Sequence, residues 1–401
     1  MCVKTSRPTT SAWEKVVIVG SGNWGSAISI VVGNNCKRLP FCQSKVNMWV
    51  YDEDVMLEDG KSEKLSQIIN TRHENVKYLK GITLPDNVVA VPDLEMACTN
   101  ATLLIFVLPH QFLPPLLKTI KNVVHPSCRG VSLIKGMDFD SATKSPKLIS
   151  QSIEEVMREG GTSATPSFSC GALMGANVAN EVAQGQICES TLASNFANVN
   201  DFDMNEQTRQ IFDSPSFRVQ HVYDVAGAEA CGALKNVIAL GAGFIDGLDE
   251  LGSNSKAALM RVGILEMIKF CKLFFKDVSD QTFLESCGMA DLITTCYGGR
   301  NRKCAEAYAR ARVQHSKSWD SKQCDGLWTK IEEDLLQGQK LQGTLACKEA
   351  HLVLASRNLL HEFPLIDVIH KISFDGDHVE QIVDGIMVTG RNSKSERTKA
   401  L

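Results

Sequence analysis

The chain has 401 residues, of which 44% are hydrophobic and 22% charged, and its formal net charge is −4 at pH 7. This composition is typical of a soluble globular protein with enough apolar residues for two or three domains. A slightly acidic chain is not expected to have nucleic acid or an anionic membrane as its main partner, so any anion site must be local. Fourteen cysteines without a C-x-x-C pair predict reduced thiols in a cytoplasmic compartment.

Strand-like and helix-like segments alternate in the N-terminal half. Short apolar runs predict buried strands within residues 15–20, 45–54, 100–109, 129–138 and 170–174, and the first run is followed by a helix over 23–35. Residues 16–33 are uncharged, but their four glycines and three serines favour strand, turn and helix over a membrane span. Residues 72–93 are of mixed character, and the composition of 159–169 predicts a loop.

Long helical windows dominate from about Val222 onward. We expect helices over 223–247, 254–276, 281–296, 301–312, 328–337, 345–358 and 363–371, and a polar surface insertion over 313–327. This order predicts an α/β Rossmann-like domain with a doubly wound, mostly parallel sheet, followed by an all-α domain. The predicted boundaries are 14–217 and 218–388, and the tails 1–13 and 389–401 are expected to be flexible.

A glycine motif stands between the first predicted strand and the first helix. Gly20, Gly22 and Gly25 form G-x-G-x-x-G, with Ser21, Asn23 and Trp24 filling the turn. Such glycines permit a tight turn and bring the backbone close to a pyrophosphate at the helix N-terminus. The context therefore predicts a dinucleotide site.

The second predicted strand ends in acids. Tyr51 could stack on an adenine, while Asp52 or Glu53 could accept hydrogen bonds from ribose hydroxyls and repel a 2′-phosphate. This end favours NAD over NADP. A solvated acidic turn is an equally plausible interpretation for each acid taken alone, and the spacing from Gly25 is longer than the usual interval of about twenty residues.

Lys235 lies in an almost wholly apolar segment, residues 231–243. On a helix, its face also carries small and apolar residues at offsets of three, four and seven, namely Ala228, Cys231, Gly232, Ile238, Ala239 and Ala242. That face is built for close burial, so an ammonium group on it must be paired or perturbed. A lysine reaching from a helix surface into solvent is the plain alternative.

Several motifs together resemble one family. They are GSGNWGSAI, NTRHENVKYLKG, LPHQF, SLIKG, LMGANVANEVA, CGALKNVIALGAGF, ADLITTCYGGRNRK and GQKLQGT. In this order, from about residue 15 to 385, they resemble the eukaryotic-type NAD-dependent glycerol-3-phosphate dehydrogenases. The resemblance implies a Rossmann domain followed by a helical domain of the 6-phosphogluconate-dehydrogenase-like type, in a homodimer. It implies an NAD-dependent interconversion of sn-glycerol 3-phosphate and dihydroxyacetone phosphate.

The resemblance also implies roles for individual residues. Lys235 would be the general acid/base, Lys135 a second lysine near the substrate oxygen, Asp291 the partner that orients a catalytic lysine, and Thr295 a hydroxyl near the reacting oxygen. Substrate-binding residues would be Lys135, Asn177, Asn236, Arg300 and Asn301, with Arg300 and Asn301 at a phosphate-binding helix start. Arg302 and Lys303 are interpreted as surface charge.

For NAD, the resemblance implies contacts by Trp24, Phe112 and Ala179 near the nicotinamide half and by Arg300 on the pyrophosphate side. Lys340 and Gln342 would belong to a mobile loop that closes over the cofactor. The histidines show no metal-ligand spacing, so no metal site is predicted.

Two other functions remain open at this point. One is a β-hydroxyacid dehydrogenase acting on a carboxylate substrate, against which the GGRNRK segment after ADLITT argues, because it suits a phosphate. The other is a catalytically silent NADH-binding regulator, for which we would expect damage at Lys135, Lys235, Asp291 or Arg300. All four are intact.

Overall fold

The computed structural model describes residues 13–58, 60–140, 143–159, 167–199, 202–314 and 319–387. The predicted C-terminal tail and all but Trp13 of the predicted N-terminal tail lie outside these ranges, as do 160–166 of the predicted loop and 315–318 of the predicted insertion. The chain divides into two compact units: Met1–Lys135 with Leu148–Val225, and Gly136–Lys147 with Ala226–Leu401. Each unit is described by itself.

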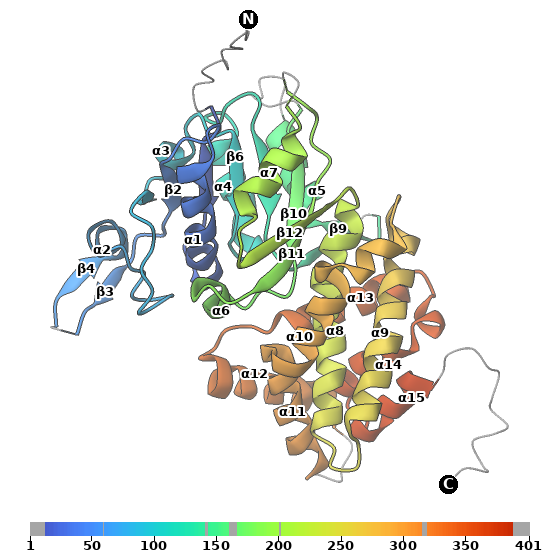
Figure 1. The fold of residues 1–401 in the computed structure, drawn as a ribbon. Coiled ribbons are helices and arrows are strands. Elements are labelled where there is room, and N and C mark those ends of the chain that lie inside the picture. The colour runs from blue at the N-terminus through green and yellow to red at the C-terminus, as the bar shows by residue number, and fades with distance from the viewer. Residues whose placement is uncertain are drawn as a thin grey trace, which may run out of the picture. The chain divides into compact units, whose positions relative to one another are not determined.

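The first unit is built on an eight-stranded sheet (Figure 1). In spatial order its strands are β12 (Phe217–Val222), β11 (Cys188–Ala193), β10 (Cys170–Met174), β7 (Arg129–Ser132), β6 (Leu103–Phe106), β1 (Val16–Val19), β2 (Val46–Trp49) and β5 (Val88–Val91). All neighbours pair in parallel except β10 and β11, which are antiparallel. The predicted mostly parallel, Rossmann-like sheet is confirmed.

Helices cover both faces of this sheet, as expected for strands that are apolar on both sides. Val16 and Ile18 point into one core, which includes side chains of α1 (Asn23–Arg38), α6 (Ala179–Ala183) and α7 (Met204–Phe212). Val17 and Val19 point into the other, with α3 (Leu94–Cys98), α4 (Leu113–Ile120) and α5 (Ile149–Arg158). The fold is therefore doubly wound around β1.

Three strands of this sheet were not predicted. β5 lies in the segment of mixed character, and β11 and β12 lie where the sequence pattern indicated no strand. In β11 the first two residues, Cys188 and Glu189, are not buried, and in the edge strand β12 buried and exposed side chains alternate along the first four residues. Neither strand is the continuous apolar run that marks a buried central strand in a sequence.

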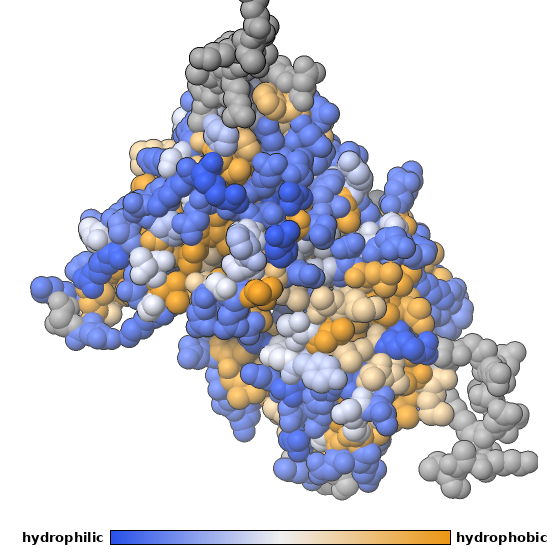
Figure 2. Space-filling model, in the orientation of Figure 1, coloured by the Kyte–Doolittle hydropathy of each residue, from blue (hydrophilic) through white to orange (hydrophobic). Residues whose placement is uncertain are grey.

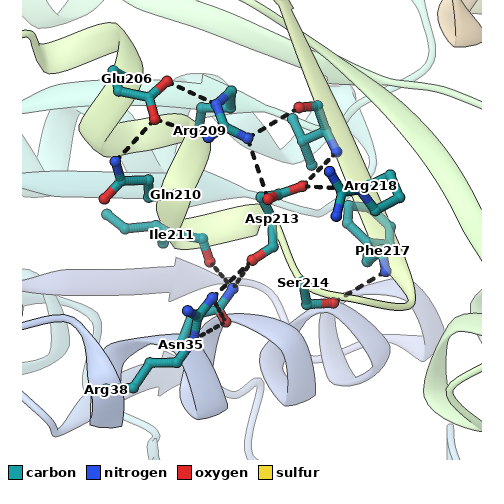
Figure 3. Close-up of polar contacts among 11 residues, drawn as sticks. Asn35, Arg38, Glu206, Arg209, Gln210, Ile211, Asp213, Ser214, Phe217 and Arg218 are labelled. Atoms are coloured by element: carbon teal, nitrogen blue, oxygen red, sulfur yellow. Dashed lines mark hydrogen bonds and ion pairs between the residues drawn. The ribbon is translucent and has the colours of Figure 1, made fainter.

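The C-terminal end of α1 is tied to the turn between α7 and β12 (Figure 3). Asn35 donates from Nδ2 to the carbonyl oxygens of Ile211, at 2.8 Å, and Asp213, at 3.1 Å. Arg38 donates to Asn35 Oδ1 and to the same Asp213 carbonyl. These bonds fix α1 against the sheet, so the position of its N-terminus is fixed as well.

The second unit is mainly helical. Its helices are α8 (Val225–Asp246), α9 (Ser253–Phe274), α10 (Asp291–Gly298), α11 (Arg300–Val313), α12 (Ser321–Leu336), α13 (Gln342–Ser356), α14 (Pro364–His370) and α15 (Ile382–Met387). A two-stranded sheet of β8 (Met137–Asp140) and β9 (Ser145–Leu148) accompanies these helices. Every residue of α8 from Gly227 to Ile245 is buried. By length and composition α8 alone among the described helices could cross a membrane, and its apolar window is 100% buried inside the protein.

Two helical predictions in this unit were wrong in detail. The expected helix over 281–296 is a 3₁₀ turn (Asp280–Leu284), a π-helical turn (Ser286–Ala290) and then α10. At Gly288 a Cβ atom would come within 2.3 Å of the Phe283 carbonyl oxygen, so the chain packs too tightly there for a regular helix. The expected insertion over 313–327 contains the first turns of α12, because Asp320 and Gln323 form a capping box at its start.

Candidate active site

The glycine turn follows β1 in the first unit. Gly20 has φ of +124°, and a Cβ atom there would lie 2.3 Å from the Val107 carbonyl oxygen. A Cβ atom on Gly25 would lie 2.3 Å from the Gly20 carbonyl oxygen, whereas one on Gly22 would meet nothing within 4 Å. Two glycines are thus required by the packing of the turn itself, and Gly22 faces open space in front of α1.

That open space suits a dinucleotide phosphate. Gly22 is the N-cap residue of α1, and no side chain caps the helix there. The first N–H groups of α1 and the positive end of its dipole are therefore available to an anion. A side chain at Gly22 would fill the space that a pyrophosphate needs, so the residues present fit NAD.

Polar side chains brace this turn. Asn75 is fully buried and donates from Nδ2 to the Ser21 carbonyl oxygen and to Ser26 Oγ, both at 2.8 Å. Asn23 donates to the Tyr78 carbonyl oxygen at 2.7 Å and to Asn180 Oδ1 at 3.0 Å. Asn75 could not be predicted from the sequence, because it lies in a mixed polar segment where no periodicity marks a buried residue.

Beyond β2, Tyr51 is 74% exposed, as an adenine-stacking residue would need to be. The two acids that follow already have partners. Asp52 Oδ1 accepts the backbone N–H of Ser66 at 3.1 Å. Glu53 accepts the Tyr78 hydroxyl at 2.7 Å and pairs closely with Lys77.

The residues predicted for the nicotinamide half lie in separate elements of the first unit. Trp24 is half-buried near the start of α1, with its ring 6.3 Å from that of Phe217. Phe112 is 55% exposed in the short turn before α4, and Ala179 is half-buried as the first residue of α6. The roles of these residues toward NAD stay predictions.

Lys135 and Asn177 follow the carboxyl ends of two neighbouring strands, β7 and β10. Lys135 Nζ donates to the Gly175 carbonyl oxygen at 2.9 Å. Asn177 donates to the Glu189 carbonyl oxygen and accepts from Ser190 Oγ at 3.1 Å. In parallel α/β sheets, ligands bind at this edge.

In the second unit Lys235 is 4% exposed on α8. Its Nζ donates to Asp291 Oδ1 at 2.5 Å and to Thr295 Oγ1 at 2.7 Å. Thr295 in turn donates to the Asp291 carbonyl oxygen at 2.6 Å, one helical turn earlier on α10. The structure thus brings together three of the four predicted catalytic residues in a buried cluster, and a charged lysine there has the charged partner that burial demands.

A thiol next to this cluster is chemically quiet. Cys296 is fully buried on α10, and burial raises its pKa to about 12. It therefore stays protonated near neutral pH and is no nucleophile.

Two asparagines link α8 to the start of α11. Asn301 donates from Nδ2 to Asn236 Oδ1 at 3.0 Å and accepts the backbone N–H of Gly343 at 2.9 Å. Asn236 also donates to the Gly232 carbonyl oxygen at 3.1 Å. Both side chains thus hold neighbouring elements in place, and the start of α11 itself, at N-cap Gly299, has no side-chain cap. The first backbone N–H groups of α11 are therefore not taken up by a capping side chain, which is the condition for binding an anion there.

Arg300, Lys340 and Gln342 lie at or beside the segment between α12 and α13. Arg300 is exposed and donates to Gln339 Oε1 at 3.0 Å. The Lys340 ammonium pairs with the buried carboxylate of Glu332 at 2.6 Å, which raises the pKa of Lys340. Glu332 also accepts the backbone N–H of Leu341 at 3.1 Å. Gln342 is the first residue of α13.

The interpretation of Arg302 as surface charge is wrong. It is half-buried and pairs with Asp246 at 3.0 Å and with Glu306 at 2.5 Å. Asp246 also holds the buried ammonium of Lys256 at 2.6 Å. This network joins α8, α9 and α11 and stabilises the unit that carries Lys235. Lys303 is exposed, as expected.

A Rossmann-like unit with an open glycine turn, together with a helical unit that buries a lysine–aspartate–threonine cluster, defines a dinucleotide-dependent oxidoreductase. Within the part of the chain that the structure describes, no three His, Cys, Asp or Glu side chains gather as a metal site would require. The particular family follows from comparison with known proteins.

Residues 15–200 match the model of the N-terminus of NAD-dependent glycerol-3-phosphate dehydrogenase, and residues 224–384 match the model of its C-terminus. The cytoplasmic glycerol-3-phosphate dehydrogenase [NAD(+)] of Rattus norvegicus is 45% identical over 93% of this chain and 97% of its own length. A glycerol-3-phosphate dehydrogenase 1-like protein of Danio rerio is 46% identical over 92% of this chain and 96% of its own.

Solved structures agree. The glycerol-3-phosphate dehydrogenase of Saccharomyces cerevisiae has a TM-score of 0.80 at 40% identity, covering 93% of this chain and 99% of that chain. That of Plasmodium falciparum has a TM-score of 0.81 at 38% identity, covering 95% and 97%. The chain belongs to the NAD-dependent glycerol-3-phosphate dehydrogenase family, and it is an NAD-dependent oxidoreductase.

Proposed function

We propose that this chain interconverts sn-glycerol 3-phosphate and dihydroxyacetone phosphate with NAD(H), using Lys235 as the general acid and base. The observation that carries the proposal is the buried cluster of Lys235, Asp291 and Thr295. It belongs to the same unit as α11, whose N-terminus is free to bind a phosphate. Family membership supplies the substrate pair.

The proton chemistry falls to Lys235. NADH supplies the hydride for the substrate carbonyl carbon when it is bound. The Lys235 ammonium then donates a proton to the carbonyl oxygen, and in the reverse direction the free amine removes it from the alcohol. Asp291 fixes the direction of the ammonium through its 2.5 Å hydrogen bond, and Thr295 holds a second N–H of the same group. A proton donor that is held in a fixed orientation lowers the entropic part of the barrier to proton transfer.

Phosphate recognition falls to α11. Its first backbone N–H groups and the positive end of its dipole would bind the phosphate beside Gly299, and Arg300 adds a guanidinium that can bind two phosphate oxygens. Asn301 keeps this helix start in register with α8 through Asn236. Lys135 and Asn177 are proposed as further substrate-binding residues, on the strength of the family motifs around them.

The glycine turn of residues 20–25 would bind the pyrophosphate, and Tyr51 the adenine. By the same motifs, Trp24, Phe112 and Ala179 are proposed near the nicotinamide half, and Arg300, Lys340 and Gln342 on the remaining cofactor surface. To contact the cofactor, the Lys340 ammonium would have to leave Glu332, with which it pairs in this structure.

We further propose a homodimer. The second unit exposes large apolar side chains, among them Leu265, Leu273 and Ile293, each 44–49% exposed, and Figure 2 shows apolar side chains gathered on the face of this unit. Such surface is typical of an interface. Sedimentation equilibrium would give the mass of two chains. The relatives named cytoplasmic support the cytoplasmic location predicted from the cysteines.

The function is tested by following NADH oxidation at 340 nm with purified protein and dihydroxyacetone phosphate. We expect turnover that prefers NADH to NADPH, requires the substrate phosphate and collapses in Lys235→Ala. Unphosphorylated dihydroxyacetone is the matched control for the phosphate. NADH binding without turnover of this substrate or of a related hydroxy acid would contradict the proposal and favour a cofactor-binding regulator.

A further inference from the structure

Three acids follow β2, at the place where a Rossmann fold meets the adenosine ribose of its cofactor. Asp52 accepts the backbone N–H of Ser66, and Asp54 pairs with Lys64 at 2.9 Å. Glu53 binds residues further along the chain than these two acids do: it pairs with Lys77 and accepts the Tyr78 hydroxyl at 2.7 Å.

The backbone holds Glu53 in place. Its N–H donates to the Tyr51 carbonyl oxygen at 3.1 Å, and its own carbonyl oxygen accepts the N–H of Leu65 at 3.0 Å. The Glu53 side chain is 21% exposed and that of Lys77 is 41% exposed. The pair is thus fixed at its acidic end and open to solvent at its basic end.

Lys77 stands next to the dinucleotide turn. The residue that follows it, Tyr78, accepts the side-chain amide of Asn23 on its carbonyl oxygen at 2.7 Å and donates its N–H to Asn75 Oδ1 at 3.0 Å. Asn75 in turn binds the turn at Ser21. Lys77 is therefore joined through its neighbour Tyr78 to the pyrophosphate turn, and through its own ammonium to the acids after β2, where a Rossmann fold holds the adenosine ribose.

We propose that the Glu53–Lys77 pair determines the preference of this protein for NAD(H) over NADP(H). A 2′-phosphate on the ribose would meet the Glu53 carboxylate and be repelled, and the Lys77 ammonium that could compensate is already neutralised by that carboxylate. Lys77 is thus a latent phosphate-binding cation that Glu53 masks. The hydrogen bond from Lys77 to Glu53 also raises the pKa of Lys77, so the ammonium stays charged throughout the neutral range.

The test is Glu53→Gln, which keeps an oxygen for the Tyr78 hydroxyl and removes the negative charge. We expect the Kd for NADPH, measured by isothermal titration calorimetry, to fall about tenfold, as for a newly available charge-assisted hydrogen bond. Lys77→Met in the Glu53→Gln background should abolish that gain. Lys80→Met in the same background removes a nearby exposed lysine instead, one that pairs with Glu58, and should leave the gain in place.

This inference rests on the proposed function, and the two can fail separately. A wild-type protein that binds NADH but does not turn over dihydroxyacetone phosphate contradicts the function and leaves the binding test intact. An unchanged Kd for NADPH in a Glu53→Gln variant with wild-type Tm overturns the inference, as does a gain that persists after Lys77→Met. A rise in the ratio of kcat/KM for NADPH to that for NADH in Glu53→Gln would support it.

Discussion

Each unit of this protein contains a cation–carboxylate pair that is almost completely buried, with at least one threonine hydroxyl beside it. In the sheet unit, Arg129 binds Glu14 through both Nη atoms, at 3.3 and 2.9 Å, with side chains 4% and 0% exposed. Thr102 donates to Glu14, and Arg129 donates to Thr208 at 3.0 Å. In the helical unit, Lys235 and Asp291 are 5% and 3% exposed. By burial and charge the two pairs are nearly equivalent.

Their chemistry and position differ. Glu14 precedes β1 and Arg129 begins β7, so the arginine pair lies at the amino ends of parallel strands, opposite the edge where ligands bind. Arginine does not release its proton in proteins, whereas a buried lysine can. The comparison teaches that a buried ion pair alone does not mark an active site. The feature that we propose to mark the active site is a releasable proton in the same unit as a helix start that is free of a side-chain cap.

The largest effect should come from making the second pair resemble the first. Lys235→Arg keeps a cation for Asp291 but cannot transfer a proton, so we expect kcat to fall by about 10³-fold. The readout is the initial rate of NADH oxidation with saturating dihydroxyacetone phosphate, alongside Tm to establish folding. Retention of a tenth or more of the wild-type kcat would mean that the cation, and not its proton, matters.

The converse change addresses the structural pair. Glu14→Gln leaves the Arg129 charge buried without its carboxylate, which should lower the free energy of unfolding by about 3 kcal/mol. Urea denaturation measures the loss, and kcat per folded molecule should not change. The double variant Glu14→Gln/Arg129→Met should recover part of the loss, because no orphan charge remains. A single variant as stable as wild type would show that this pair does not stabilise the sheet unit.

Within the described residues, a third buried carboxylate, that of Glu266, has backbone N–H groups and no cation as its hydrogen-bond donors. Glu266 on α9 accepts the N–H groups of Leu365 and Ile366 at the start of α14, yet burial raises its pKa from 4.5 to about 7. The folded state thus binds this proton more tightly than the unfolded state, so its stabilisation is complete below pH 4.5 and is lost as pH rises through 7.

Between pH 5 and 8 the free energy of unfolding of wild type should therefore fall by roughly 2–3 kcal/mol more than that of Glu266→Gln. Urea denaturation of both proteins at several pH values measures the difference. Parallel pH profiles would show that Glu266 does not titrate in this range.

The smallest effect is expected at an exposed pair. The Lys340 side chain is 74% exposed, so its pair with Glu332 contributes no more than about 1 kcal/mol to stability. Lys340→Met should leave Tm within a few degrees of wild type and raise the KM for NADH by about fivefold, since the proposed charge contact to the cofactor would be lost. An unchanged KM would remove Lys340 from the proposed cofactor site.

The central strands and the buried lysine of the cluster could be predicted from the sequence. β1 and β6 are continuous apolar runs and β2 is apolar apart from Asn47. The small residues around Lys235 predicted a buried ammonium that is paired or perturbed, and the structure pairs it with Asp291. Periodicity could not reveal β12, whose alternating side chains belong to an edge strand. It also could not reveal the π-helical turn before Asp291, because that turn depends on the tight approach of Gly288 to Phe283.

The residues that support the site were the hardest to predict. Asn75 and Glu332 act through contacts across 54 and 8 positions of sequence, to Ser21 and Lys340. Each looks like ordinary polar sequence in isolation. Their burial is a property of the tertiary structure, where an amide or a carboxylate replaces water for a backbone group.

Proton transfer by Lys235 is the central step of the proposed reaction, and chemical rescue tests it most directly. In Lys235→Ala the initial rate of NADH oxidation with dihydroxyacetone phosphate should rise in proportion to added ethylammonium, because the small cation can occupy the vacated side-chain position and donate a proton. Ethyltrimethylammonium, which has no N–H, should give no increase. A Lys235→Ala variant that turns over at the wild-type rate without any amine would contradict the account.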